Sequence, residues 1–393
     1  LAFLAVYLAV KALMLREMGF VTPEGRWILP LAPSLAWLTG IGLAGLAVGH
    51  DRGSAASRDG NRAAIRDGDR VAAGMAGGVA LAGMALAFGW LPWLYPRAAR
   101  LDPAAAGEAL PPASIVYGEA IALESAALGE LQIGRTSEAQ LVWRALAAPE
   151  ADASVSAQLL MPDGAGGWER PIKLDQQDSY PGAGSAPTGD WRSGERRADR
   201  VWLRPALDGR ELDGPVKAGL GIWLVGGPGP AEVWPMTREG RALDWPLLAE
   251  TVLRPASPPA LPSAARLAPA PRFGDAVELA GLAWADGPAG GAHLDLWWRV
   301  LTPLARDYPV FVQVLGPDGD LREQADGDPI GGASPSSIWR AGDLLRDRRN
   351  LKQAPPTGGA LLLGFYDRAT GARLEARLDG ERLGDDAFRS PIP

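Results

Sequence analysis

The feature that most constrains the fold is an internal repeat in the C-terminal part of the chain. Four segments recur there in the same order. YGEAIALESA at 117–126 matches FGDAVELAGL at 273–282, LVWRAL at 141–146 matches LWWRVL at 296–301, LLMPDG at 159–164 matches VLGPDG at 314–319, and APTGDWRSGERRAD at 186–199 matches SPSSIWRAGDLLRD at 334–347. The offset between matching positions falls from 156 to 148 residues, which loop insertions explain. The pattern indicates a tandem duplication.

Each copy is expected to form an antiparallel β-sandwich. The apolar runs after residue 95 are short and alternating, and Gly, Pro and Asp separate them, which is typical of strands and turns. Each copy spans about 120–140 residues with seven or eight candidate strands, the size of such a sandwich. Trp143 and Trp298 each fall in an alternating run, which predicts one buried face. We expect a linker at 96–114, sandwiches at 115–253 and 273–393, and a proline-rich linker at 254–272.

Composition excludes several classes of function. The chain has 39 Lys and Arg against 46 Asp and Glu, a net charge of −7, which argues against a nucleic-acid partner because phosphate contacts need a basic face. The absence of cysteine excludes disulfides, zinc–thiolate sites, iron–sulfur clusters and thiol catalysis. The two histidines, His50 and His293, are too few for a multi-histidine metal site. We therefore expect no cofactor, and the need for a divalent metal stays open.

Long apolar stretches occupy the first 95 residues. Residues 27–48 and 71–95 contain no charged side chain, and each is longer than the about 20 residues that a helix needs to cross a bilayer core. Residues 1–16 resemble the last part of a further span. The expected fold class is therefore mixed membrane α plus all-β: a partial and two complete transmembrane helices, followed by two tandem antiparallel β-sandwich domains.

The charges between these stretches predict an orientation. The loop at 49–70 carries five arginines, which assigns it to the cytoplasm because Lys and Arg accumulate on that side. The expected localisation is a multi-pass protein of the cell membrane with residues 96–393 outside.

Two parts of the chain resemble known membrane enzymes. EGRWILPLAPSLAWL at 24–38 is similar to the GRY-(I/L)-(F/L)-P segment of lipid-carrier-dependent glycosyltransferases, the family 39, protein-mannosyltransferase-like and aminoarabinose-transferase-like enzymes. The second copy resembles a C-terminal β module found on such proteins of the Chloroflexi type. The matching pieces are FGD at 273–275, LDLWWRVL at 294–301, DYPVFVQVLGPDG at 307–319, QADGDP at 324–329, SIWRAGDLLRD at 337–347 and LLLGFYDRATGARL at 361–374. The first copy departs from the pattern, reading GIWLVGGPGPAEVWPM at 221–236.

The resemblance implies a function for the parent protein. The chain looks like the C-terminal fragment of a membrane glycosyltransferase that moves a sugar from a polyprenyl-phosphate donor, with the sandwiches as accessory or glycan-positioning modules. The catalytic carboxylates of that family lie in a first outer loop that this chain does not contain, so we expect no catalytic residue here. The alternative is a membrane-anchored carbohydrate- or envelope-binding protein without enzyme activity. A third interpretation is a purely structural brace.

Few residues qualify as site candidates. Arg26, beside Glu24, could hold a lipid phosphate through its guanidinium fork, or it could be an interfacial anchor or ion pair. Trp191 and Trp339 recur at equivalent points, so they could stack on sugar rings or belong to the core. The aspartates at 318, 320, 326 and 328 could bind calcium, although hairpin turns also explain them. The expected partners are membrane lipid, polyprenyl-phosphate sugar and glycan.

Overall fold

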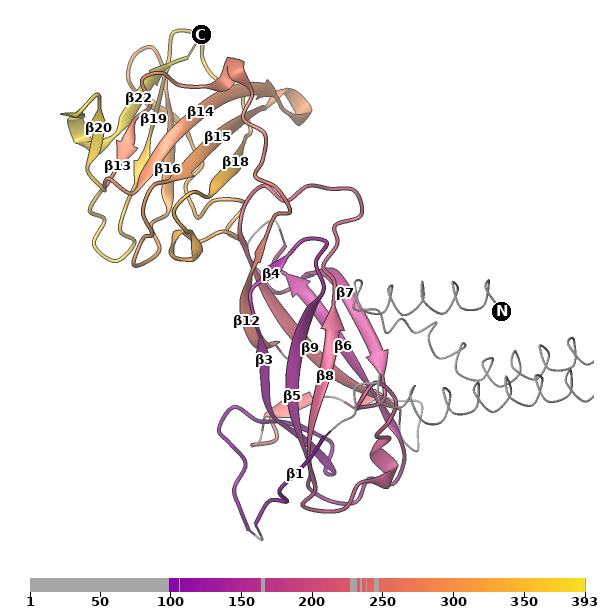
Figure 1. Cartoon of the computed structure of the whole chain (residues 1–393). Helices are drawn as coiled ribbons and strands as arrows, with labels where there is room; N and C mark the ends of the chain where they lie inside the picture. Colours follow the sequence, from indigo (N-terminus) through magenta and orange to yellow (C-terminus); the bar gives the residue numbers. More distant parts are fainter. Residues whose placement is uncertain are drawn as a thin grey trace, which may run out of the picture.

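The structure, a computed structural model, describes residues 99–392 apart from 106, 164–166, 227–231, 234, 238 and 244–246. Its regular elements are almost all strands (Figure 1).

The strands of the first half are β1 (Ala99–Leu101), β2 (Ile115–Tyr117), β3 (Ile121–Leu128), β4 (Leu131–Gln132), β5 (Ser137–Ala145), β6 (Ala153–Met161), β7 (Ile172–Ser179), β8 (Arg196–Leu203), β9 (Val216–Gly226), β10 (Glu232–Val233), β11 (Pro235–Thr237) and β12 (Leu247–Arg254). Those of the second half are β13 (Arg272–Phe273), β14 (Val277–Asp286), β15 (Ala292–Val300), β16 (Val310–Leu315), β17 (Leu321–Gln324), β18 (Leu344–Leu351), β19 (Ala360–Phe365), β20 (Ala376–Leu378), β21 (Glu381–Arg382) and β22 (Phe388–Pro391). Short 3₁₀ turns are η3 (Thr188–Asp190), η4 (Ser263–Ala265), η5 (Pro288–Gly290), η6 (Ser336–Ile338) and η7 (Gly384–Asp386).

Each half folds into two sheets, and the strand order is the same in both. The order β8-β5-β3-β2-β11 of the first sheet recurs as β18-β15-β14-β13-β20, and β12-β9-β6-β7 recurs as β22-β19-β16-β17. A bulge also recurs, between Leu123 and Ser125 in β3 and between Leu279 and Gly281 in β14. We call the two halves the N-terminal and the C-terminal sandwich; they lie end to end (Figure 1).

The core of the N-terminal sandwich lies between its two sheets. Leu123, Leu141 and Trp143 come from one sheet and meet Leu159 and Leu220 from the other, all almost completely buried. Leu141 and Trp143 lie two residues apart on β5, so the period of two points both side chains at the core. The Tyr117 hydroxyl donates a 2.8 Å hydrogen bond to the Ile222 carbonyl, which ties the sheets together through the core.

The core of the C-terminal sandwich is more aromatic. The Trp298 ring lies 4.8 Å from that of Phe365 and 5.8 Å from that of Phe273, both in edge-to-face geometry. Trp339 packs edge-on against Phe365 at 6.2 Å. Such pairs add about 0.5–1.5 kcal/mol each beyond their buried area. An aromatic cluster therefore fills this core, and its Phe273 and Trp298 stand at the positions that Tyr117 and Trp143 hold in the other half.

The same loop precedes β8 and β18. In the N-terminal sandwich the Gly182 N–H donates to the buried Asp199 carboxylate (2.7 Å), and in the C-terminal one the Ile330 N–H donates to Asp347 (3.0 Å). Gly182 and Ile330 both have positive φ, at 67° and 55°. This conformation is strained for a β-branched residue, so the buried aspartate and the surrounding contacts must hold it.

The proline-rich segment between the sandwiches is packed against the C-terminal sandwich. The Trp297 indole donates to the Ala260 carbonyl (2.9 Å), and the Leu267 N–H donates to the Ala280 carbonyl (3.1 Å). Arg266 and Gly281 form an isolated β-bridge. Residues 260–267 therefore cover the outer face of β14 and β15.

The expected fold class is wrong for the described chain. Mixed membrane α plus all-β was expected, but the part of the chain that the structure describes is all-β and contains no α-helix. Its apolar residues alternate with a period of two and are cut by turn residues, which favours strands. The expected spans at about 1–16, 27–48 and 71–95 and the loop at 49–70 lie outside the described residues.

The expected localisation is corrected with it. Within the described ranges, none of the helical segments has the length and apolar character that crossing a bilayer requires. A multi-pass cell-membrane protein with residues 96–393 outside therefore finds no support in the structure.

Candidate binding site at the junction of the sandwiches

The residues expected to bind lipid or sugar do not form a site. Glu24 and Arg26 lie outside the described residues. Trp191 and Trp339 are only 2% and 1% exposed, directly after η3 and η6. Their indole N–H groups donate to the Ala186 carbonyl (3.3 Å) and to Ser334 Oγ (2.9 Å). Neither ring presents a face to solvent, so the geometry favours the core alternative over sugar stacking.

The aspartates considered for calcium are separated and engaged elsewhere. Asp318 pairs with Arg322 in the hairpin turn between β16 and β17, and Asp328 pairs with Arg368 (3.1 Å). Asp326 accepts the Val312 N–H (2.9 Å). Among the residues that the structure describes, no group of three or more acidic or histidine side chains has the geometry of a metal site. Turn formation accounts for these aspartates.

The most elaborate polar arrangement lies where the two sandwiches meet. The loop before β18, residues 329–343, contacts the end of the N-terminal sandwich (Figure 1); we call it the docking loop. The Lys217 N–H donates to the Ala333 carbonyl (2.8 Å), and the Ser334 hydroxyl donates to the Pro215 carbonyl. Just after the loop, the Arg346 N–H donates to the Asp213 carbonyl (2.7 Å). Main-chain bonds therefore fix the loop on β9.

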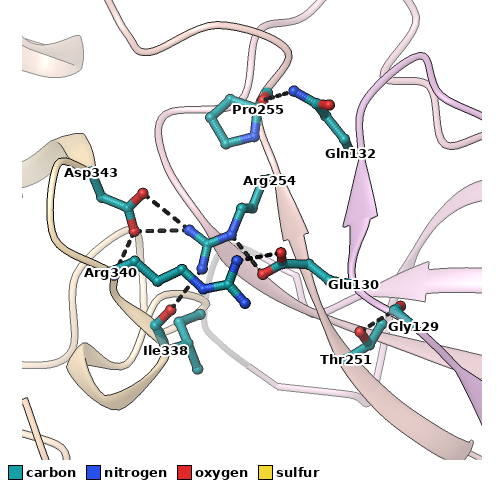
Figure 2. Close-up of polar contacts among 9 residues, drawn as sticks. All are labelled: Gly129, Glu130, Gln132, Thr251, Arg254, Pro255, Ile338, Arg340 and Asp343. Atoms are coloured by element: carbon teal, nitrogen blue, oxygen red, sulfur yellow. Dashed lines mark hydrogen bonds and ion pairs between the residues drawn. The ribbon is translucent and has the colours of Figure 1, made fainter. Parts of the chain in front are cut away.

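Charged side chains complete this contact (Figure 2). Arg254, at the end of β12, lies 2.6 Å from Glu130 and 2.8 Å from Asp343, and it donates to the Ile338 carbonyl at 3.3 Å. Arg340 pairs with the second oxygen of Glu130 at 2.6 Å. The side chain of Arg254 is only 15% exposed, so this network is screened less than an ordinary surface pair. We call these four residues the junction network.

A further ion pair lies beside the network. Arg346 pairs with Asp213 at 2.7 Å across the junction. Burial raises the pKa of the Asp213 carboxyl, and the charge of Arg346 opposes that rise. The half-buried carboxylate of Asp213 is therefore stabilised in its charged form by Arg346 of the other sandwich.

A groove of about 470 Å³ opens beside the junction network. It is lined by residues 130–132, 135–137, 254–258 and 342–344, with Pro215. The lining includes two carboxylates, Glu130 and Asp343, and two guanidinium groups, Arg135 and Arg254, so its formal charge is balanced. The Gln132 amide donates to the Pro255 carbonyl (3.3 Å) and holds the wall in place (Figure 2). The volume falls within the roughly 300–1,000 Å³ of small-molecule sites.

The chemistry of the groove is that of binding. Arg254 forms ion pairs with both carboxylates of the lining, Glu130 at 2.6 Å and Asp343 at 2.8 Å. The groove can offer hydroxyl, amide and charged groups to a polar ligand, with proline rings between them.

Comparison with protein-family models and with curated proteins finds no match to this chain. The resemblance to lipid-carrier-dependent glycosyltransferases therefore stays a prediction that rests on the sequence segments alone.

Sequence reasoning missed the junction because it treated residues 254–272 as a linker. The sequence did contain a signal. Arg254 precedes the second copy as Arg100 precedes the first, and each arginine pairs with the acidic residue of a Trp-Arg-x-Gly-(Asp/Glu) segment in the copy that follows it. Arg100 lies 3.2 Å from Glu195, the counterpart of Asp343.

Proposed function

We propose that residues 99–392 form a rigid accessory module that binds a short, neutral glycan in the junction groove. The observation that carries this proposal is the polar groove of about 470 Å³ whose walls come from both sandwiches. The proposed role is binding and positioning, and it assigns no bond-making step to the described residues.

The balanced charge of the groove favours a neutral ligand. Two carboxylates face two guanidinium groups, so neither a phosphate nor a cation meets an excess of opposite charge. A sugar chain carries many hydroxyl groups that both donate and accept hydrogen bonds, which suits a lining of this kind. Pro255 and Pro258 add apolar surface for the faces of sugar rings.

The junction network gives the groove a fixed shape. A ligand that spans two domains loses affinity if it must first order them, since ordering costs free energy on binding. Arg254 joins Glu130 of one sandwich to Asp343 of the other and so removes part of that cost. The same rigidity would hold a bound glycan at a constant distance from whatever the rest of the protein carries.

The proposal can be tested with the full chain on a glycan array, followed by calorimetry with the neutral di- to tetrasaccharides that bind. Ser257 lines the groove and is exposed, so Ser257→Trp should fill it and weaken binding at least about 10-fold. Ser263 is equally exposed on η4 and does not line the groove, so Ser263→Trp is the matched control and should bind as the wild type does.

Two results would contradict the proposal. One is the absence of binding to any neutral oligosaccharide at millimolar concentration. The other is unchanged affinity in the folded Ser257→Trp variant, which would move any glycan site away from the junction.

A further inference from the structure

The N-terminal sandwich carries a second copy of the docking loop. Residues 181–195 repeat several main-chain hydrogen bonds of residues 329–343. The Gly184 N–H donates to the Tyr180 carbonyl (2.8 Å) as Gly332 does to Asp328 (3.0 Å), and the Ala186 N–H donates to Pro181 (3.0 Å) as Ser334 does to Pro329 (3.1 Å). The Arg192 N–H donates to Glu195 (3.0 Å) as that of Arg340 does to Asp343 (2.8 Å). We call residues 181–195 the matching loop.

The two loops differ in what they touch. In the docking loop, the Ala333 carbonyl and the Arg340 guanidinium bind the neighbouring sandwich through Lys217 and Glu130. Their counterparts at the constant offset of 148 residues are Ser185 and Arg192. Arg192 is exposed, and within the described part of the chain its guanidinium contacts no acidic side chain. The matching loop lies at the far end of the N-terminal sandwich, away from the junction (Figure 1).

The C-terminal sandwich carries the complementary end. Asp286 is the last residue of β14 and lies nine residues after Val277, the first residue of that strand. Glu130 likewise lies nine residues after Ile121, the first residue of β3, so the two acidic residues are equivalent in the repeat. Asp286 is exposed and has no basic partner among the described residues.

The main-chain donor is also repeated there. The registers of β6 with β9 and of β16 with β19 place Gly358 where Lys217 lies in the first sandwich. Gly358 is exposed, but it lies in the turn before β19 with φ at 73°, whereas Lys217 lies within β9, so the position of the donor is repeated and its backbone conformation is not. We call residues 286 and 356–358 the open end.

We propose that the matching loop docks on the open end of a second copy of this chain, in the geometry of the intramolecular junction. Arg192 then pairs with Asp286 as Arg340 pairs with Glu130. The contact is heterologous, since each copy offers one matching loop and one open end, and association continues head to tail. Arg100 and Ala104 of the same chain bind the matching loop only at Glu195 and Gly194, and the guanidinium of Arg192 stays exposed beside them.

The structure also indicates that this contact is weaker than the junction. No hydroxyl corresponds to Ser334, since its counterpart is Ala186, and no linker ties the partners together. A short linker supplies the junction with an effective concentration of about 1 mM, which the untethered contact lacks, so we look for association at protein concentrations of about 0.1–1 mM.

Sedimentation velocity on the full chain between 10 µM and 1 mM tests the proposal, with these concentrations bracketing the range just estimated. The wild type should show larger species as concentration rises. Arg192→Glu and Asp286→Arg each place like charges opposite one another, so each alone should weaken association at least about 10-fold. Mixing the two variants in equal amounts restores opposite charges at every contact and should restore the wild-type behaviour. Arg200→Glu, at another exposed arginine of the same sandwich, is the control and should associate like the wild type.

Three outcomes would overturn the proposal. The first is a chain that stays monomeric at 1 mM. The second is association that neither charge reversal weakens. The third is a monomer in which cross-linking joins the matching loop to residues before 99, which would mean that the chain itself covers this surface.

Discussion

A single buried aspartate holds each of the two repeated loops. Asp199 and Asp347 sit on β8 and β18, where the alternation points them inward, and each accepts a main-chain N–H from its loop. Asp347 is completely buried and is paired with Arg349, whose guanidinium reaches it at 2.7 Å. Among the described residues Asp199 has no such ion-pair partner. It accepts the N–H groups of Gly182 and Arg200, both at 2.7 Å, and a hydrogen bond from the Trp143 side chain. The buried carboxylate is therefore stabilised by an ion pair in the C-terminal sandwich and by hydrogen bonds alone in the N-terminal sandwich.

The difference predicts a pH effect at Asp199. Burial raises the pKa of its carboxyl above the ordinary 3.8, although the N–H groups of Gly182 and Arg200 oppose the rise. The native state then holds this proton more tightly than the unfolded chain, so the stabilisation is complete below pH 3.8 and is lost as the pH rises through the native pKa. Asp199→Asn keeps the acceptor oxygen and cannot ionise. The free energy of unfolding of Asp199→Asn, measured by urea denaturation, should therefore improve relative to the wild type as the pH rises from acid to neutral.

Asp367 supplies a control of opposite sign. The N–H of Ala369, followed by that of Thr370, lowers the pKa of the Asp367 carboxyl. Asp367→Asn should therefore lose stability relative to the wild type as the pH rises. Parallel behaviour of the two variants would contradict the assignment of buried charge to Asp199.

The repeated tryptophans give a second prediction at this scale. Because Trp191 and Trp339 are buried in the cores, Trp191→Ala or Trp339→Ala should lower the free energy of unfolding by about 3–5 kcal/mol. Trp202, half-buried on β8, is the control, and Trp202→Ala should cost clearly less. Thermal and urea unfolding measure both. A folded Trp339→Ala variant of wild-type stability that merely lost glycan binding would favour sugar stacking instead.

At the scale of elements, the sequence predicted the strands, which follow from hydrophobic periodicity, and missed the packing of the proline-rich segment, which depends on tertiary contacts. The alternation around Trp143 and Trp298 places both on buried faces, as expected. The proline-rich run at 254–272 carries no such period, and nothing in its composition distinguishes a free linker from a segment that packs. Its packing depends on Gly281 of β14 and Trp297 of β15. Both contact the segment in the fold, but no sequence pattern links them to it. The fold class expected from the apolar stretches in residues 1–95 is not that of the described chain, and those stretches lie outside the described residues.

The packed segment predicts the effect of a methyl group at Gly281. A Cβ there would lie 2.9 Å from the Ala265 carbonyl oxygen and would collide with the Leu261 side chain, so residues 260–267 would have to move. Gly281→Ala should therefore destabilise the C-terminal sandwich by about 1–3 kcal/mol, as overpacking does. Gly384→Ala is the control, since nothing lies within 4 Å of the added atom. Equal stability of the two variants in urea would mean that the segment does not hold its place in solution.

At the scale of the whole molecule, the candidate site belongs to neither sandwich alone. The groove is closed by residues 130–137 of one and 342–344 of the other, and Arg254 lies between them at the end of β12. The duplication supplied two similar domains, and the docking loop of the second supplied the contact. Single-sequence reasoning finds each copy from its pattern, whereas the surface between copies arises only when Arg254, Glu130, Arg340 and Asp343 are brought together in space.

Removing Arg254 should therefore release the sandwiches from each other without unfolding either. Arg254→Ala leaves Asp343 without its guanidinium partner and Glu130 with Arg340 alone, which should cost about 1–3 kcal/mol at the junction. The chain has no cysteine, so Gln140→Cys and Gln353→Cys, at exposed sites in the two sandwiches, allow specific spin labelling. The wild type should give a narrow distribution of label distances, and Arg254→Ala a broad one. Arg322→Ala removes an ion pair within the C-terminal sandwich and should leave the distribution narrow. If Arg254→Ala stays as narrow as this control, main-chain bonds such as that from Lys217 to Ala333 suffice to fix the junction, and the groove keeps its shape without the network.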